Sequence, residues 1–400
     1  MNATLTFSCF QIFFFTIMWV SKTLHPIYFE SAGSLANFGL SYSCMALAGY
    51  FSFLTGSYTD RFGSTKSLSI GSMLYSIGLF ARAFPESKLI AIVGGLTAGV
   101  GASMVLNSLR LWMLEESTSD NKARWVGLKS STAALGTAMG CALAGFLPTF
   151  TFFTASVRAI LMTSGIVLFL VGFIIFIFSQ QSGTVQTIQK VSPLKNVKKI
   201  FSEYRYLSLF ASCIGVLTGF YVSFVSPYLP LIMKEKGLSL ESIGLSIGVF
   251  SLIRFFLDPM IAQWIEKHKS DSLKIFLVSE ISILIVTGLF ALTISKEIFI
   301  GFLVLRSIAL GFSTISEELL WIQKFPRESV ALFFGLSQSS FFLGDFLGGL
   351  LNGSLYQNFG LSACVGIAVV TIIMNAFLFI LLFKDQNQHP ITAVPSTVVT

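Results

Sequence analysis

The chain has 400 residues, of which 54% are hydrophobic and only 11% charged, and its mean hydropathy is +0.79. This composition supplies too little polar surface for a soluble globule of that size, which excludes a soluble enzyme or binding domain and indicates an integral membrane protein. The net charge of +7 gives no reason to expect a nucleic-acid partner, because loops on one side of a membrane account for it.

Apolar runs of about 20 residues, enough to cross roughly 30 Å of hydrocarbon as a helix, recur along nearly the whole chain. Only short connections separate them, so no soluble domain fits between. The runs predict an all-α membrane protein with twelve transmembrane helices, at residues 7–28, 36–56, 67–84, 88–112, 125–147, 152–180, 206–229, 241–264, 272–294, 297–322, 330–353 and 358–383.

The first run differs from a secretory signal peptide because no basic segment precedes it and Lys22 interrupts its apolar core. We therefore expect it to be retained as the first span. After the second run, the stretch GSYTDRFGSTKS at 56–67 places Asp60 and Arg61 side by side, in what we expect to be a short turn. The two charges either solvate this turn or make a specific contact.

Glycines in the fifth predicted helix are separated by 9, 4 and 5 residues, and those in the eleventh have the same three spacings. The two sets are Gly127, Gly136, Gly140 and Gly145 in the fifth helix, and Gly335, Gly344, Gly348 and Gly353 in the eleventh. Residues four apart share a helix face, so each set predicts a smooth stripe that another backbone can approach closely. Each stripe either packs helices tightly or forms the surface on which two bundles rock.

A second repeat pairs SLANFGLS at 34–41 with SLESIGLS at 239–246, again six helices apart. The chain is therefore expected to contain two pseudo-symmetric bundles of six helices. We place the N-terminal bundle at 1–180 and a polar, lysine-rich linker at 181–204. The C-terminal bundle then covers 205–384, and 385–400 is a tail.

Basic residues concentrate in alternate loops, which by the positive-inside rule face the cytoplasm. That set holds Arg61, Lys66, Lys122, Arg124, Lys190, Lys195, Lys198, Lys199, Arg205, Lys267, Lys269, Lys274, Lys324, Arg327 and Lys384. The opposite loops hold only Lys88, Lys234, Lys236 and Lys296, with Arg82 just inside a span end. This bias predicts a multi-pass protein of the cytoplasmic (inner) membrane with both termini inside.

Catalytic and metal-binding patterns are missing from the sequence. The five cysteines stand singly in the spans, and no HExxH, P-loop or GxSxG pattern occurs. We therefore expect neither an enzyme nor a bound metal or cofactor.

Charges inside the spans are unevenly shared between the halves. The first half embeds only the bases Lys22, Arg110 and Arg158, with Arg82 and Lys129 close enough to span ends to reach water. The second half embeds Arg254, Asp258, Glu280, Arg306, Glu317, Glu318 and Asp345. Arg254 and Asp258 are one helical turn apart and are expected to form a local ion pair.

The loop after the second span resembles the signature of the major facilitator superfamily, G-x-L-A-D-R-x-G-R-K-x-x-L, at Gly56, Asp60, Arg61, Gly63 and Leu68. The equivalent turn of the second half, AQWIEKHKSDSLK, repeats it weakly with Glu266 and Lys267. Tyr58, Thr59, Ser64 and Thr65 depart from the pattern. The resemblance implies that Asp60 lies near the N-terminus of a helix in the opposite bundle and helps to hold one access state.

The glycines of the fifth helix resemble an antiporter signature of that family, G-x8-G-x3-G-P-x2-G-G, with Cys141 at the Pro position and Ala144 at one Gly position. A companion signature in the fourth helix requires an Arg where this chain has Gly95. The first pattern favours export in exchange for protons, and the second weakens that expectation.

The family architecture further implies that the first, fourth, seventh and tenth helices line a central cavity, which makes Lys22 and Arg306 the substrate candidates. Proton coupling needs a buried carboxylate, and the candidates are Asp345, Glu280 and Asp258. Asp345 is preferred because it follows Gly344 on the eleventh helix. The alternative is that Asp345 is permanently paired with Arg306.

We therefore expect a monomeric secondary transporter that moves a small molecule by alternating access, with export by proton antiport preferred. Uptake by proton symport is the alternative mode of transport. The alternative outside transport is a receptor or scaffold protein built on the same fold. The embedded bases indicate an anionic or zwitterionic substrate, although the sequence does not name it.

Overall fold

The structure, a computed structural model, describes residues 3–116, 122–149, 157–179, 201–268, 271–292, 295–325 and 330–383. Most of the expected linker 181–204 and the tail 385–400 lie outside these residues. The described chain is helical throughout its spans, as the apolar runs predict.

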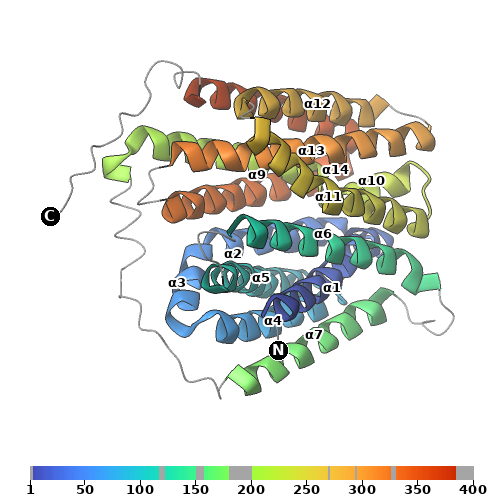
Figure 1. Cartoon of the computed structure of the whole chain (residues 1–400). Coiled ribbons are helices and arrows are strands. Elements are labelled where there is room, and N and C mark those ends of the chain that lie inside the picture. Colours follow the sequence, from blue (N-terminus) through green and yellow to red (C-terminus); the bar gives the residue numbers. More distant parts are fainter. Residues whose placement is uncertain are drawn as a thin grey trace.

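The first bundle contains α1 (Ala3–Ser31), α2 (Leu35–Tyr50), α3 (Ser52–Phe62), α4 (Ser64–Ala81), α5 (Lys88–Glu116), α6 (Lys122–Phe146) and α7 (Val157–Ser179), with the short 3₁₀ turn η1 (Leu147–Thr149) after α6. The second contains α9 (Arg205–Val225), α10 (Leu229–Glu235), α11 (Leu240–His268), α12 (Ser272–Leu292), α13 (Lys296–Lys324) and α14 (Val330–Phe383). Figure 1 shows the blue-to-green helices α1 to α7 and the yellow-green-to-red helices α9 to α14 as two bundles lying against each other.

These elements make up twelve membrane-crossing segments among the described residues. Phe51 alone separates α2 from α3, α10 continues the direction of chain begun by α9, and Gly360, with a φ of 73°, breaks α14 into two helices. Nine helical stretches of the described chain are individually long and apolar enough to span a bilayer. The remaining three segments are α2 with α3, α4, and the part of α14 before Gly360.

The expected turn at 56–67 is mostly helix, which corrects the prediction. The helix α3 continues to Phe62 and α4 begins at Ser64, so that only Gly63 is non-helical. Gly63 has a φ of 84°, a left-handed conformation that disfavours residues with a Cβ. This explains why position 63 is a glycine. A single residue in this conformation is enough to connect α3 to α4.

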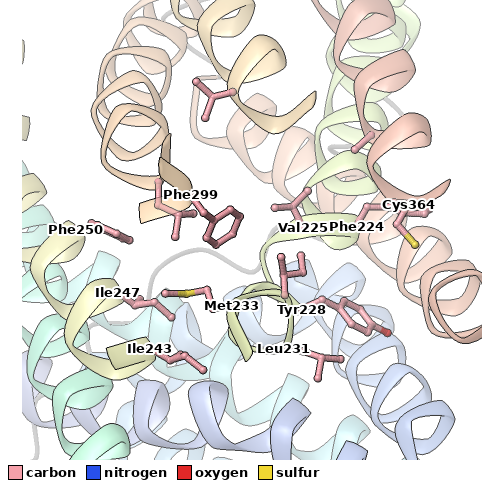
Figure 2. Packing of buried hydrophobic residues seen from close by; sticks show 14 of the residues in the cluster. Phe224, Val225, Tyr228, Leu231, Met233, Ile243, Ile247, Phe250, Phe299 and Cys364 are labelled. Carbon is pink, nitrogen blue, oxygen red and sulfur yellow. The ribbon is translucent and has the colours of Figure 1, made fainter. Parts of the chain in front are cut away.

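The end of the molecule that holds the 32–34 and 236–239 connections is predicted by the loop charges to face outward, and we call it the predicted outer end. Buried apolar residues of both bundles form one core cluster there, with Phe29, Phe38 and Cys141 joining residues of α9 to α14. Figure 2 shows Tyr228 and Met233 among side chains of α11, α13 and α14. Burial of this shared cluster holds the bundles together at the predicted outer end.

Candidate functional site: the contact between the bundles

The two bundles meet along two helix pairs, α2 with α14 and α6 with α11. A Cβ added at Gly39 of α2 would lie 3.4 Å from the Cα of Gly353 of α14. A Cβ at Gly244 of α11 would lie 2.9 Å from the Cα of Gly145 of α6. Gly39 and Gly244 occupy the same place in the repeated octapeptide, so the repeat forms two equivalent close contacts.

The middle glycines of the two stripes lie inside the bundles, which favours tight helix packing, the first of the two alternatives, over a surface on which the bundles rock. A Cβ at Gly136 or Gly140 would overlap the backbone of α1 in its own bundle. A Cβ at Gly344 or Gly348 would likewise overlap α9, whose carbonyl oxygens or side chains fill the space. The stripes therefore pack α6 against α1 and α14 against α9. Among the glycines of the two sets whose surroundings the structure describes, only Gly145 and Gly353 reach the other bundle.

The predicted helix contact can be checked for the first glycine of one set, Gly335, but not for that of the other, Gly127. A Cβ at Gly335 would meet nothing within 4 Å, so Gly335 is not a helix-contact glycine, contrary to expectation. Gly127 is within α6, but its surroundings lie outside the described residues. Sequence spacing alone could not distinguish an open glycine from a tightly packed one.

An ion pair joins the bundles at the predicted outer end. Lys234 Nζ of α10 lies 2.5 Å from Glu30 Oε2 of α1, and both side chains are about 40% exposed, at 42% and 39%. The exposed pair is worth at most about 1 kcal/mol because water and salt screen it. The pair is informative because it identifies two residues on opposite bundles that are in contact when this end is closed.

Asp345 of α14 makes the most informative polar contact between the bundles. Its side chain is only 4% exposed, and Tyr42 of α2 donates its hydroxyl at 3.0 Å to Oδ1 and 3.1 Å to Oδ2. Lys22 of α1 is the nearby base that interacts with Asp345 electrostatically. The structure contains no ion pair between Asp345 and Arg306, which contradicts the alternative pairing.

Asp258 forms the expected local ion pair. Arg254 Nη2 lies 2.9 Å from Asp258 Oδ2, and Ser130 of α6 donates to the same oxygen at 3.4 Å. Because Ser130 belongs to the first bundle, this pair also lies at a bundle contact. The ion pair keeps Asp258 compensated, which makes it a weaker coupling candidate than Asp345.

Arg82 was expected to reach water at a span end, but the structure buries it. Its side chain is 4% exposed, Nη1 donates to Ser21 Oγ at 2.8 Å, and Nη2 donates to Met45 Sδ at 3.3 Å. The guanidinium also lies 5.8 Å from the centre of the Tyr75 ring. Arg82 is the residue that follows the last residue of α4, and its contacts with Ser21 of α1 and Met45 of α2 hold its side chain inside the bundle.

Arg306 and Glu280 belong to a polar group inside the second bundle. Both are buried, at 7% and 1% exposure, and Ser313 donates to Glu280 Oε1 at 2.6 Å. The titratable groups that act on Arg306 are Tyr221 and Glu280, both in this bundle. Glu280 Oε2 and Arg306 Nε have no hydrogen-bond partner among the described atoms.

The loop motif is described only in part. Arg61 is exposed, and its guanidinium lies 5.1 Å from the centre of the Phe62 ring. The side chains of Asp60, Glu266 and Lys267 lie outside the described residues. The proposed contact of Asp60 with the opposite bundle therefore stays a prediction.

A cavity of about 630 Å³ lies away from the bundle contact, between α11, α12 and α13. Its lining includes Val278, Ile285 and Leu305, each more than half exposed in the isolated chain. Such a surface is what the acyl chains of lipid cover in a membrane protein. The charged groups at the bundle contact, rather than this groove, are the candidate site.

The sequence profile of the Major Facilitator Superfamily matches residues 3–316 and 211–397. The chain belongs to the Major Facilitator Superfamily. It is therefore a multi-pass membrane protein and a secondary transporter of a small molecule, and not an enzyme.

Individual relatives in this superfamily are distant. The chain is 24% identical over 348 residues to the quinolone resistance protein NorA of Staphylococcus aureus strain MRSA252, with 83% of this chain and 84% of the relative covered. The corresponding protein of strain MSSA476 is 25% identical over the same length and coverage.

Two solved structures share the fold at 13% sequence identity. One is a bacterial homologue of the human lysosomal transporter Spinster in an inward-facing, unoccupied conformation, with a TM-score of 0.73 and coverage of 96% of this chain and 97% of the other. The second is the D-xylose-proton symporter, with a TM-score of 0.71 and coverage of 94% and 95%. At this identity the likeness shows the fold alone.

Sequence reasoning missed Tyr42 and Arg82 as members of the site. Tyr42 lies in the segment SYSCM, where nothing marks it as the partner of a carboxylate 303 residues away. Arg82 stood at the end of an apolar run, a position at which long basic side chains usually reach water. Only the packing of α1, α2 and α4 brings these side chains to Lys22 and Asp345.

Proposed function

We propose that this superfamily member exports a small organic molecule across the cytoplasmic membrane in exchange for protons. The observation that carries the proposal is the buried Asp345, which bonds to Tyr42 across the bundle contact. A carboxylate at the contact that must open and close is well placed to couple protonation to the change of access. The antiporter-like glycine pattern and the similarity to quinolone resistance proteins also support export.

Alternating access then assigns a role to the two ends of the molecule. With the shared apolar cluster intact, the predicted outer end is closed, so substrate enters from the cytoplasmic side. Opening the outer end separates Gly39 from Gly353, Gly145 from Gly244, and Glu30 from Lys234. The Asp60 loop is proposed to hold the cytoplasmic end when the outer end opens.

The direction of coupling can be measured in proteoliposomes that carry the purified protein. A quinolone such as norfloxacin is the first probe, because of the relatives' name, followed by other antibiotics, siderophores, peptides and sugars. An antiporter accumulates substrate when the vesicle interior is acidic, whereas a symporter does so when the interior is alkaline. Protein-free vesicles correct for passive redistribution of the probe.

The three possible outcomes distinguish proton antiport, proton symport and a protein that does not transport. Accumulation with an acidic interior is expected, and accumulation only with an alkaline interior would establish uptake by symport instead. Failure of every probe to exchange in counterflow would favour a receptor or scaffold on the same fold.

Closing the outer end permanently should stop transport. In a variant with Glu30→Cys and Lys234→Cys, and with the exposed Cys9 and Cys213 changed to Ser, a short bis-methanethiosulfonate reagent would bridge the bundles. We expect crosslinked protein to lose at least about tenfold in transport rate, since the bundles must separate here, and to recover on addition of dithiothreitol.

Each single-cysteine variant treated with the same reagent is the matched control. Full transport by the crosslinked protein would mean that Glu30 and Lys234 stay together throughout the cycle, and would remove this end of the contact from the gating scheme.

A further inference from the structure

The polar group around Lys22 carries more positive than negative charge. Lys22 is partly exposed at the bundle contact, and the titratable groups that act on it are Arg82, Asp345 and Cys141. Its ammonium lies 5.1 Å from the centre of the Trp19 ring. The two bases Lys22 and Arg82 therefore lie near a single carboxylate, that of Asp345. The thiol of Cys141 is neutral and adds no charge.

Arg82 has only neutral hydrogen-bond partners. Ser21 and Met45 accept from its terminal nitrogens, and Nε has no partner within hydrogen-bonding geometry. Neither Arg82 nor Lys22 takes part in an ion pair within the described part of the chain. His25, which Arg82 also affects, is packed between the rings of Phe29 and Phe38 and supplies no negative charge.

An uncompensated charge held away from water is costly, and charged groups inside spans usually mark a substrate or ion path. Asp345 can compensate one of the two bases when it is ionised. The other base needs an anion, and no described residue provides one. Because Lys22 is partly exposed at the contact, a ligand that enters between the bundles can supply that negative charge.

We infer that Lys22 and Arg82 form a subsite for the carboxylate of a zwitterionic substrate, whose cationic group binds Asp345. Lys22 contacts the carboxylate, and Arg82, held behind it by Ser21, is a positioning residue that strengthens the positive field. This inference rests on the proposed function and names the substrate class of the same site.

The substrate needs a cationic group because the proposed transport exchanges substrate for protons. In antiport, substrate and proton must compete, and a substrate ammonium competes directly with a proton for the Asp345 carboxylate. A simple anion would instead bind more tightly when Asp345 is protonated, which would couple the two in the same direction. A zwitterion therefore satisfies both the net charge of the subsite and proton antiport.

Trp19 and Tyr42 flank the charged groups and favour an apolar, aromatic body between the two charges of the substrate. The Trp19 ring already lies beside Lys22, and Tyr42 already contacts Asp345. A small aromatic zwitterion is thus the ligand class that the residues on both bundles fit.

Equilibrium binding to the purified full chain in detergent, measured by isothermal titration calorimetry, tests the assignment. Norfloxacin is compared with its ethyl ester, which keeps only the cation, and its N-acetyl form, which keeps only the carboxylate. Naphthylalanine, its amide and its N-acetyl form are a second matched set on a different scaffold.

The expected result is that the zwitterion of at least one set binds more tightly than both single-charge forms. Arg82→Gln, which keeps a donor for Ser21 but removes the charge, should weaken the carboxylate-bearing ligands about tenfold. It should leave the ester or amide unchanged, and this retained binding also shows that the variant is folded. Arg82→Lys should restore the preference for the carboxylate.

Arg158→Gln is the matched control, because this first-bundle arginine lies over the Phe84 ring and is not among the groups that act on Lys22. Equal weakening of acid and ester by Arg82→Gln would make Arg82 purely structural and overturn the inference. Absence of binding in both sets would overturn the assignment of an aromatic zwitterion, while proton-driven export of another compound would still stand.

Discussion

Asp345→Asn is expected to abolish transport driven by a proton gradient, while exchange of substrate at equal pH on both sides continues once the substrate concentration is raised, because the neutral amide attracts the cationic group of the substrate less strongly than the carboxylate does. The amide keeps the size of the side chain and can still bond to Tyr42, but it cannot take up or release a proton. Gradient-driven uptake and counterflow, measured on the same proteoliposomes, report the two activities separately.

Tyr42→Phe is the matched control for this prediction. It removes the hydroxyl that bonds to both oxygens of Asp345 but leaves the carboxyl group, so gradient-driven transport should persist. If Asp345→Asn keeps gradient-driven transport and Glu280→Gln loses it, the coupling site moves to α12. There Glu280 shares the interior of the second bundle with Arg306.

Gly344→Ala is expected to destabilise the protein strongly for a change of one methyl group. A Cβ at this position would overlap the carbonyl oxygen of Val216 on α9, and backbone atoms cannot move aside as a flexible side chain can. Overpacking of this kind typically costs about 1–3 kcal/mol. Thermal unfolding of the purified protein, followed by loss of monodisperse material, should show a clearly lower midpoint.

Gly335→Ala is a control on the same helix. A Cβ there would meet nothing within 4 Å, so the same substitution should leave the midpoint unchanged or raise it slightly. Similar midpoints for the two variants would show that α9 and α14 pack less closely than described. Gly140→Ala on α6 should behave like Gly344→Ala, because the Thr16 carbonyl of α1 occupies the equivalent space.

The transmembrane segments and the two-bundle architecture followed from the sequence because the bilayer imposes simple rules. Hydrocarbon excludes charges and sets the length of each apolar run, so the positions of the helices could be predicted to within a few residues. Repeated patterns then related the two halves, and Gly39 and Gly244 lie at equivalent bundle contacts in agreement with that repeat. The main error was at 56–62, where α3 is helical in place of the expected turn.

The partners of individual side chains could not be predicted in the same way. A membrane helix is apolar on the side facing lipid and on the side facing its neighbours, so periodicity does not reveal which face is buried. For this reason Gly136 and Gly344 could be predicted to pack closely, but not that α1 and α9 are their neighbours.

The sequence by itself determined that this is a membrane protein of two repeated halves, with only bases embedded in the first half and both bases and acids in the second, since length, charge and repetition are properties of the chain alone. Only the tertiary structure decided that Arg82 turns inward to Ser21 and that Asp345 meets Tyr42. Both contacts join residues far apart in sequence, and their existence depends on the tilt and rotation of whole helices. Packing against neighbouring helices sets those angles, which is why the candidate site emerged only once the bundles were assembled.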